Sequence, residues 1–182
     1  MLKDVMGVIY TGENDANLRE LTMMRAIAAL PVAGRYRVVD FLLSSLVNAG
    51  IRNVGVIMQK NYHSLMDHLG SGKEWDLHGK HDGLYVLPPF LTRENVGVYN
   101  GTLDALRSNT NYLSRSRQEY VVFSGTNFIY NTRMNEFIQY HLDSGAEISL
   151  MYTRDPSVLR EEYGTGSSAG CPCCAHGCSG QT

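Results

Sequence analysis

Polar residues follow three short apolar runs of the chain, and these positions are the first candidates for chemistry. The runs end at Thr11, Met58 and Phe123, and Gly12, Gln59 and Gly125 follow them within two residues. If the runs are parallel strands, their carboxyl ends meet at one edge of a sheet, where open α/β sheets bind their ligands. A binding or catalytic site is therefore predicted in the loops after these three runs.

Alternating apolar runs and helical patterns predict the elements that position these loops. Apolar residues recur at helical spacing over 39–47, 62–69, 101–113 and 134–142. Short apolar runs predict strands at 5–11, 54–58, 84–87, 120–123 and 147–153, and the polar stretch 71–83 predicts a loop. Strands that alternate with helices form βαβ units, so the predicted fold is α/β with a mostly parallel sheet.

The composition is that of a globular domain and excludes several classes of protein. The chain has 182 residues, of which 43% are hydrophobic and 19% charged, enough for one domain with a substantial core. A net charge of −2 without a dense Lys/Arg cluster argues against a nucleic-acid-binding surface. The apolar run at 5–10 is too short for a membrane span and lacks a cleavage site, so we expect a cytoplasmic protein.

All four cysteines lie in the last twelve residues, at Cys171, Cys173, Cys174 and Cys178. The folded body therefore does not depend on disulfides. Residues 166–182 are rich in Gly, Ser and Cys and have no apolar period, which predicts an unstructured tail. A shifted reading frame or a broken gene is our preferred explanation. A zinc site that also uses His176 is the alternative.

Several motifs occur in a fixed order along the chain. They include Leu-Arg-Glu-Leu-Thr at 18–22, Leu-Pro-Val-Ala-Gly-Arg-Tyr-Arg at 30–37, Asn-Ala-Gly-Ile-Arg at 48–52 and Tyr-Asn-Gly-Thr-Leu-Asp-Ala at 99–105. This order resembles bacterial ADP-glucose pyrophosphorylases, which join ATP and glucose 1-phosphate for glycogen synthesis. The resemblance implies a Rossmann-like nucleotide-diphospho-sugar transferase fold, with 1–165 as a partial domain and the family's C-terminal β-helix domain absent.

Three departures from that family remove charged groups that its chemistry uses. Where the family has a glycine-rich loop ending in arginine, residues 12–17 read Gly-Glu-Asn-Asp-Ala-Asn, with Asn17 at the arginine position. Ile27 stands where a lysine binds phosphate, and Thr126 stands where an aspartate holds Mg²⁺. Phosphoryl transfer relies on positioning and charge stabilisation, and one stabilising group is worth roughly 10²–10³ in rate.

This chain keeps the family's structural motifs but lacks these three charged residues. In this respect it resembles the regulatory, D-type subunits of the family. The resemblance implies a catalytic ADP-glucose pyrophosphorylase subunit as partner in a hetero-oligomer, and a phosphorylated sugar as effector. We expect no catalytic residue, metal or cofactor in this chain, although the family uses Mg²⁺. The alternative is a working sugar-phosphate nucleotidyltransferase in which Glu13, Asp15 or Asp104 supplies the metal carboxylate.

The resemblance also predicts vestigial binding residues. The predicted nucleotide- and sugar-binding residues are Gly12, Gln59, Tyr99, Gly101, Thr102 and Asp104, and the predicted effector-binding residues are Arg35 and Arg37. Each prediction has a structural alternative. Gln59 would be a solvated loop residue, Thr102 a helix N-cap, and both arginines partners of nearby acids such as Asp40.

Overall fold

The computed structural model describes residues 4–12, 16–79, 82–89, 99–127 and 129–152. The chain divides into two compact units, Met1–Tyr140 and His141–Thr182. None of the helices within the described ranges has the length and apolar character that a membrane crossing requires. The predicted tail at 166–182 lies outside the described residues.

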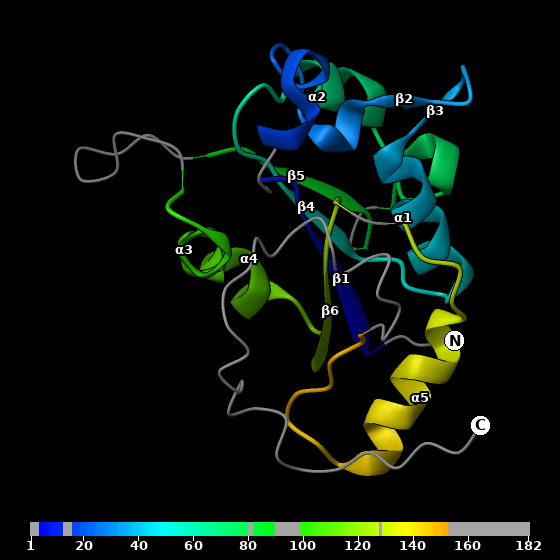
Figure 1. Ribbon diagram of the computed structural model, residues 1–182. Helices are drawn as coiled ribbons and strands as arrows, with labels where there is room; N and C mark the ends of the chain where they lie inside the picture. Colours follow the sequence, from blue (N-terminus) through cyan, green and yellow to red (C-terminus); the bar gives the residue numbers. More distant parts are fainter. Residues whose placement is uncertain (1–3, 13–15, 80–81, 90–98, 128, 153–182) are drawn as a thin grey trace, which may run out of the picture. The chain divides into compact units, whose positions relative to one another are not determined.

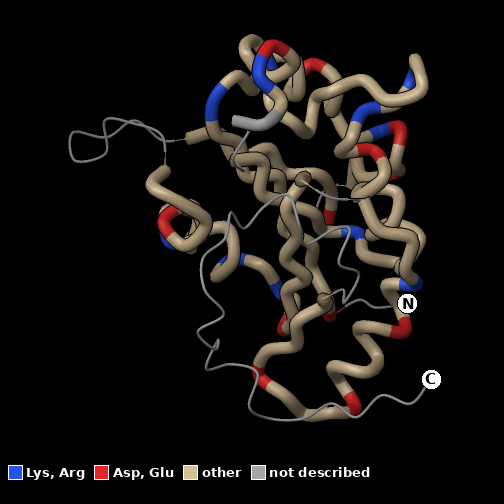
Figure 2. The backbone as a smooth tube through the Cα atoms, viewed as in Figure 1, with Lys and Arg blue, Asp and Glu red and all other residues tan. Residues whose placement is uncertain are grey.

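Four parallel strands form the central sheet of the first unit, in the order β5-β4-β1-β6 (Figure 1). Their bounds are β1 Val5–Tyr10, β4 Val54–Ile57, β5 Leu84–Leu87 and β6 Tyr120–Gly125. These strands contain no charged residue, and Figure 2 shows the acidic and basic residues on the helices and loops around them. The prediction of an α/β fold with a parallel sheet is confirmed for these four strands.

Helices and short turns connect the strands. The α-helices are α1 Val38–Asn48, α2 His63–Leu69, α3 Thr102–Ser108, α4 Thr110–Arg115 and α5 Met134–Ser144. Three 3₁₀ segments, η1 Ala16–Leu21, η2 Ile27–Ala29 and η3 Lys73–Trp75, and the antiparallel pair β2 Pro31–Val32 and β3 Tyr36–Arg37 complete the described elements.

The helix predicted over 101–113 is two helices that meet at Asn109. The Asn109 side-chain amide donates to the carbonyl of Ala105 at 2.8 Å, so a side chain competes with the backbone for a helical acceptor. Asparagine weakens helix interiors in this way. Asn109 also donates to the Tyr99 hydroxyl at 3.3 Å, which fixes the break against the core.

Two glycines let a helix approach each face of the sheet, with α1 on one side and α3 and α4 on the other (Figure 1). A Cβ on Gly7 of β1 would lie 2.8 Å from a methyl of Leu46 in α1. A Cβ on Gly55 of β4 would lie 2.5 Å from the ring of Tyr112 in α4. Glycine in a strand often marks such a close approach.

The strand predicted at 147–153 is wrong for its described part, 147–152, which has no regular secondary structure. Its alternating apolar residues are exposed instead, with Ile148 78% and Leu150 75% accessible. Alternation predicts which side chains share a face, but a strand also needs a neighbour for its backbone hydrogen bonds. No strand pairing within the described ranges includes 147–152.

We expect Gly55→Ala to destabilise the protein more than Gly7→Ala. The added methyl of Gly55→Ala meets the Tyr112 ring, which a 2.7 Å bond from its hydroxyl to Asn53 holds in place. Overpacking of this kind costs about 1–3 kcal/mol. Gly7→Ala meets only the flexible end of Leu46. Urea unfolding measures the free energy of unfolding of both variants. An equal decrease in the two variants would contradict this explanation.

Candidate functional site

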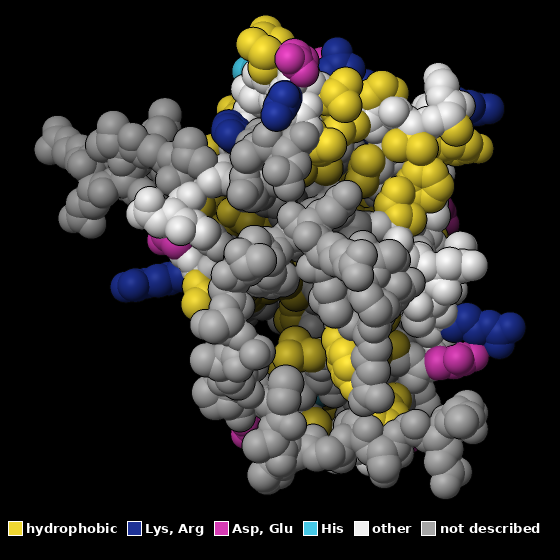
Figure 3. All heavy atoms as spheres, viewed as in Figure 1, with side chains coloured by type: hydrophobic (Ala, Val, Ile, Leu, Met, Phe, Trp, Pro, Cys, Tyr) yellow, Lys and Arg dark blue, Asp and Glu magenta, His cyan; other side chains and the backbone are white. Residues whose placement is uncertain are grey.

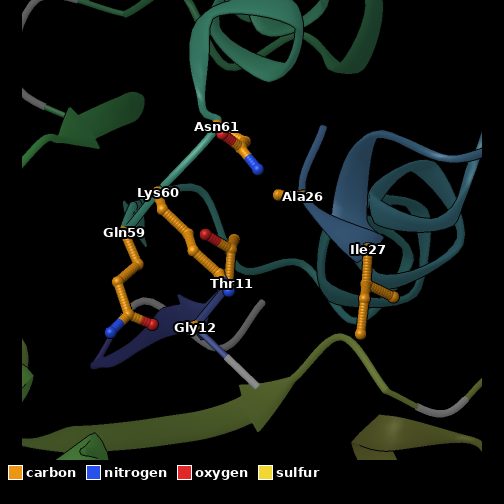
Figure 4. A pocket seen from close by; sticks show the side chains of 7 residues that line it. All are labelled: Thr11, Gly12, Ala26, Ile27, Gln59, Lys60 and Asn61. Atoms are coloured by element: carbon orange, nitrogen blue, oxygen red, sulfur yellow. The ribbon is translucent and has the colours of Figure 1, made fainter. Parts of the chain in front are cut away.

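A small pocket lies at the carboxyl ends of β1 and β4, where the sequence predicted a site. It is lined by Thr11, Gly12, Ala26, Ile27, Gln59, Lys60 and Asn61 (Figure 4). Three segments far apart in the sequence therefore build it: the end of β1, the turn into η2 and the end of β4. Its free volume is about 10 Å³, close to that of one water molecule.

Gln59 forms one wall of the pocket and is held at both ends of its amide. Its carbonyl oxygen accepts a bond from the Tyr10 hydroxyl at 3.3 Å, and its NH₂ donates to the carbonyl of Tyr99 at 2.8 Å. Gly12 lies against this side chain, and a Cβ there would overlap both Gln59 and the Tyr10 ring. Gln59 is thus a fixed, half-buried group rather than a solvated loop residue.

Hydrogen bonds also fix the remaining polar walls. The buried Thr11 hydroxyl donates to the carbonyl of Ile57 at 3.1 Å. The Asn61 amide donates to the carbonyls of Thr22 at 3.3 Å and Met23 at 3.1 Å. The walls formed by Thr11, Gln59 and Asn61 are therefore held by contacts within the protein.

Lys60 supplies a positive charge that the sequence analysis missed. Ile27 is buried and lines the pocket as an aliphatic residue, as expected for the lost lysine position. Lys60 lines the same pocket from the loop after β4, and its side chain extends toward Thr11 (Figure 4). The sequence offered one indication of this role, because Lys60 directly follows the predicted site residue Gln59. Isoleucine at position 27 therefore does not leave the described pocket without a positive charge.

The described pocket residues do not fit Mg²⁺. They offer hydroxyl, amide and ammonium groups, whereas Mg²⁺ sites in proteins rely on one or two carboxylates. Among the described residues, no group of three His, Cys, Asp or Glu side chains is placed to hold a metal ion. Glu13 and Asp15, which the active-enzyme alternative invokes, lie outside the described residues.

The loop after β6 contains Thr126, which the sequence analysis matched to the family's metal-binding aspartate. Thr126 is only 1% exposed, so its hydroxyl points into the protein rather than into open solvent. Tyr130 lies nearby in sequence, and burial raises its pKa, although a hydrogen bond with Ser124 opposes this shift. The end of β6 is thus built from packed, neutral groups.

The predicted residues at 99–104 mostly serve the fold. Tyr99 is 4% exposed and belongs to a core cluster with Tyr10 and Ala105, so it reaches the pocket only through its carbonyl. Gly101, with φ 144°, is the N-cap of α3, and Thr102 is the exposed first residue of that helix. The alternative of Thr102 as N-cap is therefore wrong.

Asp104 also has a structural contact, because its carboxylate accepts a bond from the backbone N–H of Asn100 at 3.0 Å. An acid in the first turn of a helix is favoured by the helix dipole. Asp104 does not line the pocket at β1 and β4. The structure thus brings Gly12 and Gln59 together there but leaves Gly101, Thr102 and Asp104 at the start of α3.

The two predicted effector arginines have different surroundings. Arg35 is exposed, between β2 and β3. The Arg37 guanidinium donates to both the carbonyl and the hydroxyl of Ser64 in α2. Asp40 instead pairs with His68 at 2.6 Å and accepts the Arg37 backbone N–H at 2.9 Å. The alternative in which the Arg37 side chain pairs with Asp40 is therefore wrong.

Most of this chain is similar in sequence to proteins that have a described function. Residues 6–167 match the family model described as nucleotidyl transferase. The chain is 39% identical over 155 residues to the glycogen biosynthesis protein GlgD of Bacillus subtilis, covering 85% of this chain and 45% of that protein. It is 34% identical over 163 residues to the glucose-1-phosphate adenylyltransferase of Fervidobacterium nodosum, covering 90% of this chain and 39% of that enzyme.

A solved structure supports the fold. A putative glucose-1-phosphate thymidylyltransferase from Bacillus anthracis superposes with a TM-score of 0.59 at 18% identity, covering 76% of this chain and 50% of that one. The chain spans less than half the length of each of these two curated relatives. The chain therefore belongs to the nucleotidyl transferase family, and its relatives there include glycogen biosynthesis proteins and glucose-1-phosphate adenylyltransferases.

Proposed function

We propose that this chain is a regulatory, catalytically deficient subunit of glucose-1-phosphate adenylyltransferase that supports ADP-glucose synthesis in the cytoplasm. The observation that carries the proposal is the pocket at the ends of β1 and β4. Its described lining has the aliphatic Ile27 where the catalytic relatives are expected to use lysine, and it has no carboxylate. The similarity to GlgD of Bacillus subtilis and of Geobacillus stearothermophilus agrees with this role.

The charges explain why we propose weak catalysis. Adenylyl transfer needs groups that stabilise negative charge as it shifts between phosphates, and the family is expected to use Mg²⁺ together with several cations. Lys60 is the charged side chain among the described lining residues. A single ammonium neutralises part of a triphosphate but does not replace a metal ion held by carboxylates.

Lys60 also makes the pocket suitable for sensing a ligand. An ammonium at the end of β4, beside fixed amide and hydroxyl groups, favours a phosphate group over a neutral one. A phosphorylated sugar or nucleotide is larger than the free volume of about 10 Å³, so its binding would have to move a wall of the pocket, and we propose that Gln59 moves. Its binding would thereby reach Tyr10 and Tyr99 in the core, which Gln59 contacts.

Arg35 is the better candidate for a second effector contact. It is exposed, whereas the Arg37 guanidinium already bonds Ser64. The partner in this proposal is the catalytic subunit of the same enzyme. The alternative function, an active sugar-phosphate nucleotidyltransferase, is favoured by one observation, the lysine at the pocket.

We expect this protein to raise ADP-glucose formation when mixed with a catalytic glucose-1-phosphate adenylyltransferase and to form little product alone. The measurement is the rate of ADP-glucose formation from ATP and glucose 1-phosphate, with and without each protein. An unchanged rate and effector response of the catalytic protein would remove the regulatory proposal. Rapid product formation by this chain alone, lost when Glu13, Asp15 or Asp104 is changed to its amide, would establish the alternative.

We expect Lys60→Met to weaken ATP binding by about tenfold or more, because a hydrogen bond to a charged group is worth about 1.5–3 kcal/mol. Isothermal titration calorimetry measures the dissociation constant. The matched control is Lys73→Met, because Lys73 is an exposed lysine in η3 outside the pocket. Equal affinities of the two variants would show that the pocket lysine does not sense phosphate.

A further inference from the structure

A second, larger cleft opens at the opposite edge of the sheet, where the strands begin. Its volume is about 840 Å³, within the range of small-molecule sites. The lining residues are Asp4, Asn53, Asp82, Tyr85, Leu87, Ser108, Asn109, Asn111, Tyr112, Arg115, Ser116, Arg117 and Gln118. It shares no lining residue with the pocket described above. We call it the amino-end cleft.

One wall of the amino-end cleft is a chain of hydrogen bonds between four segments. The Tyr112 hydroxyl donates to the Asn53 side-chain oxygen at 2.7 Å, and the Asn53 NH₂ donates to the Gln118 side-chain oxygen at 2.9 Å. The Gln118 NH₂ donates in turn to the Asp82 carboxylate at 3.2 Å. Asn53 is 5% exposed, so this wall is anchored in the interior and is rigid before any ligand arrives.

Two tyrosines add an aromatic surface to this wall. Tyr112 lies over Gly55 of β4, and its ring centre is 5.3 Å from that of Tyr85 on the edge strand β5. Tyr85 is 38% exposed, so part of its ring faces solvent in the cleft. Burial raises the pKa of Tyr112, with Tyr85 and Asp82 adding to the shift, and its hydroxyl therefore remains a donor at neutral pH.

The charges around the amino-end cleft balance. The lining contains two acids, Asp4 and Asp82, and two bases, Arg115 and Arg117, so it has no net charge to attract a phosphate or a metal ion. The cleft therefore offers a ligand hydroxyl, amide and carboxylate groups beside an aromatic ring. Such a surface suits a ligand that is uncharged, carries many hydroxyls and has one apolar face.

We propose that the amino-end cleft binds a neutral saccharide. The exposed ring of Tyr85 stacks on the C–H face of a sugar ring, while its hydroxyls exchange hydrogen bonds with Asp82, Asn111 and Gln118. The volume accommodates more than one sugar unit. This site does not depend on whether the chain regulates a catalytic partner, because no residue of the phosphate-sensing pocket takes part.

Calorimetric titration of the whole chain with maltohexaose and with cellohexaose tests the site. We expect binding of at least one hexasaccharide, and about tenfold weaker binding, equivalent to about 1.4 kcal/mol, in Tyr85→Ala. Tyr85→Phe should keep the affinity because the ring remains. The matched control is Tyr36→Ala, since Tyr36 is 50% exposed but lies on β3, outside the cleft.

Three outcomes would overturn the saccharide site. These are no binding of either hexasaccharide at millimolar concentration, unchanged binding in Tyr85→Ala, and binding of inorganic phosphate that is lost in Arg115→Met. Thermal unfolding checks that Tyr85→Ala is folded. If it is not, Asn111→Ala takes its place, because Asn111 is exposed and its side chain belongs to the proposed contact.

Discussion

Parallel hydrogen bonding of β1 to both of its neighbours is the constraint on which the first unit depends. Tyr10 is in register with Ile57 of β4 and with Gly125 of β6, so three strands end together. All six residues of β1 are buried, and the strand cannot shift without moving apolar groups on both faces. This register places Gly12 beside Gln59 at one edge and Asp4 near Asn53 at the other.

The strands and most helices could be predicted because their cause is local in the sequence. Runs such as Val54–Ile57 are apolar throughout, which suits a strand covered on both faces. The break at Asn109 depends on a side chain that reaches back to Ala105, and helical spacing carries no trace of that bond. The strand expected at 147–153 failed over its described part for the related reason that pairing needs a partner, which the sequence pattern does not supply.

The sequence predicted where the pocket lies but only some of the residues that line it. A pocket lies at the carboxyl edge and Gly12 and Gln59 line it, while their binding of a nucleotide or sugar stays a prediction. A comparison of motifs, however, treats each position separately. Isoleucine in place of lysine at position 27 therefore indicated that the site had lost a positive charge. Lys60 lines the same pocket from the loop after β4, and Tyr99 is buried in the core. Both outcomes are set by tertiary packing, which a linear motif does not record.

The two edges of the sheet differ in the way they use polar groups. At the carboxyl edge, the Gln59 amide bonds to Tyr10 and Tyr99 at its two ends, and Lys60 lines the same very small space. At the amino edge, Asn53 is satisfied in the interior while Asp82 and Tyr85 remain accessible beside a large space. Because interior bonds hold each wall, a charge can change at one edge without disturbing the other. The proposed loss of catalytic charges at one edge is therefore compatible with the proposed saccharide site at the other.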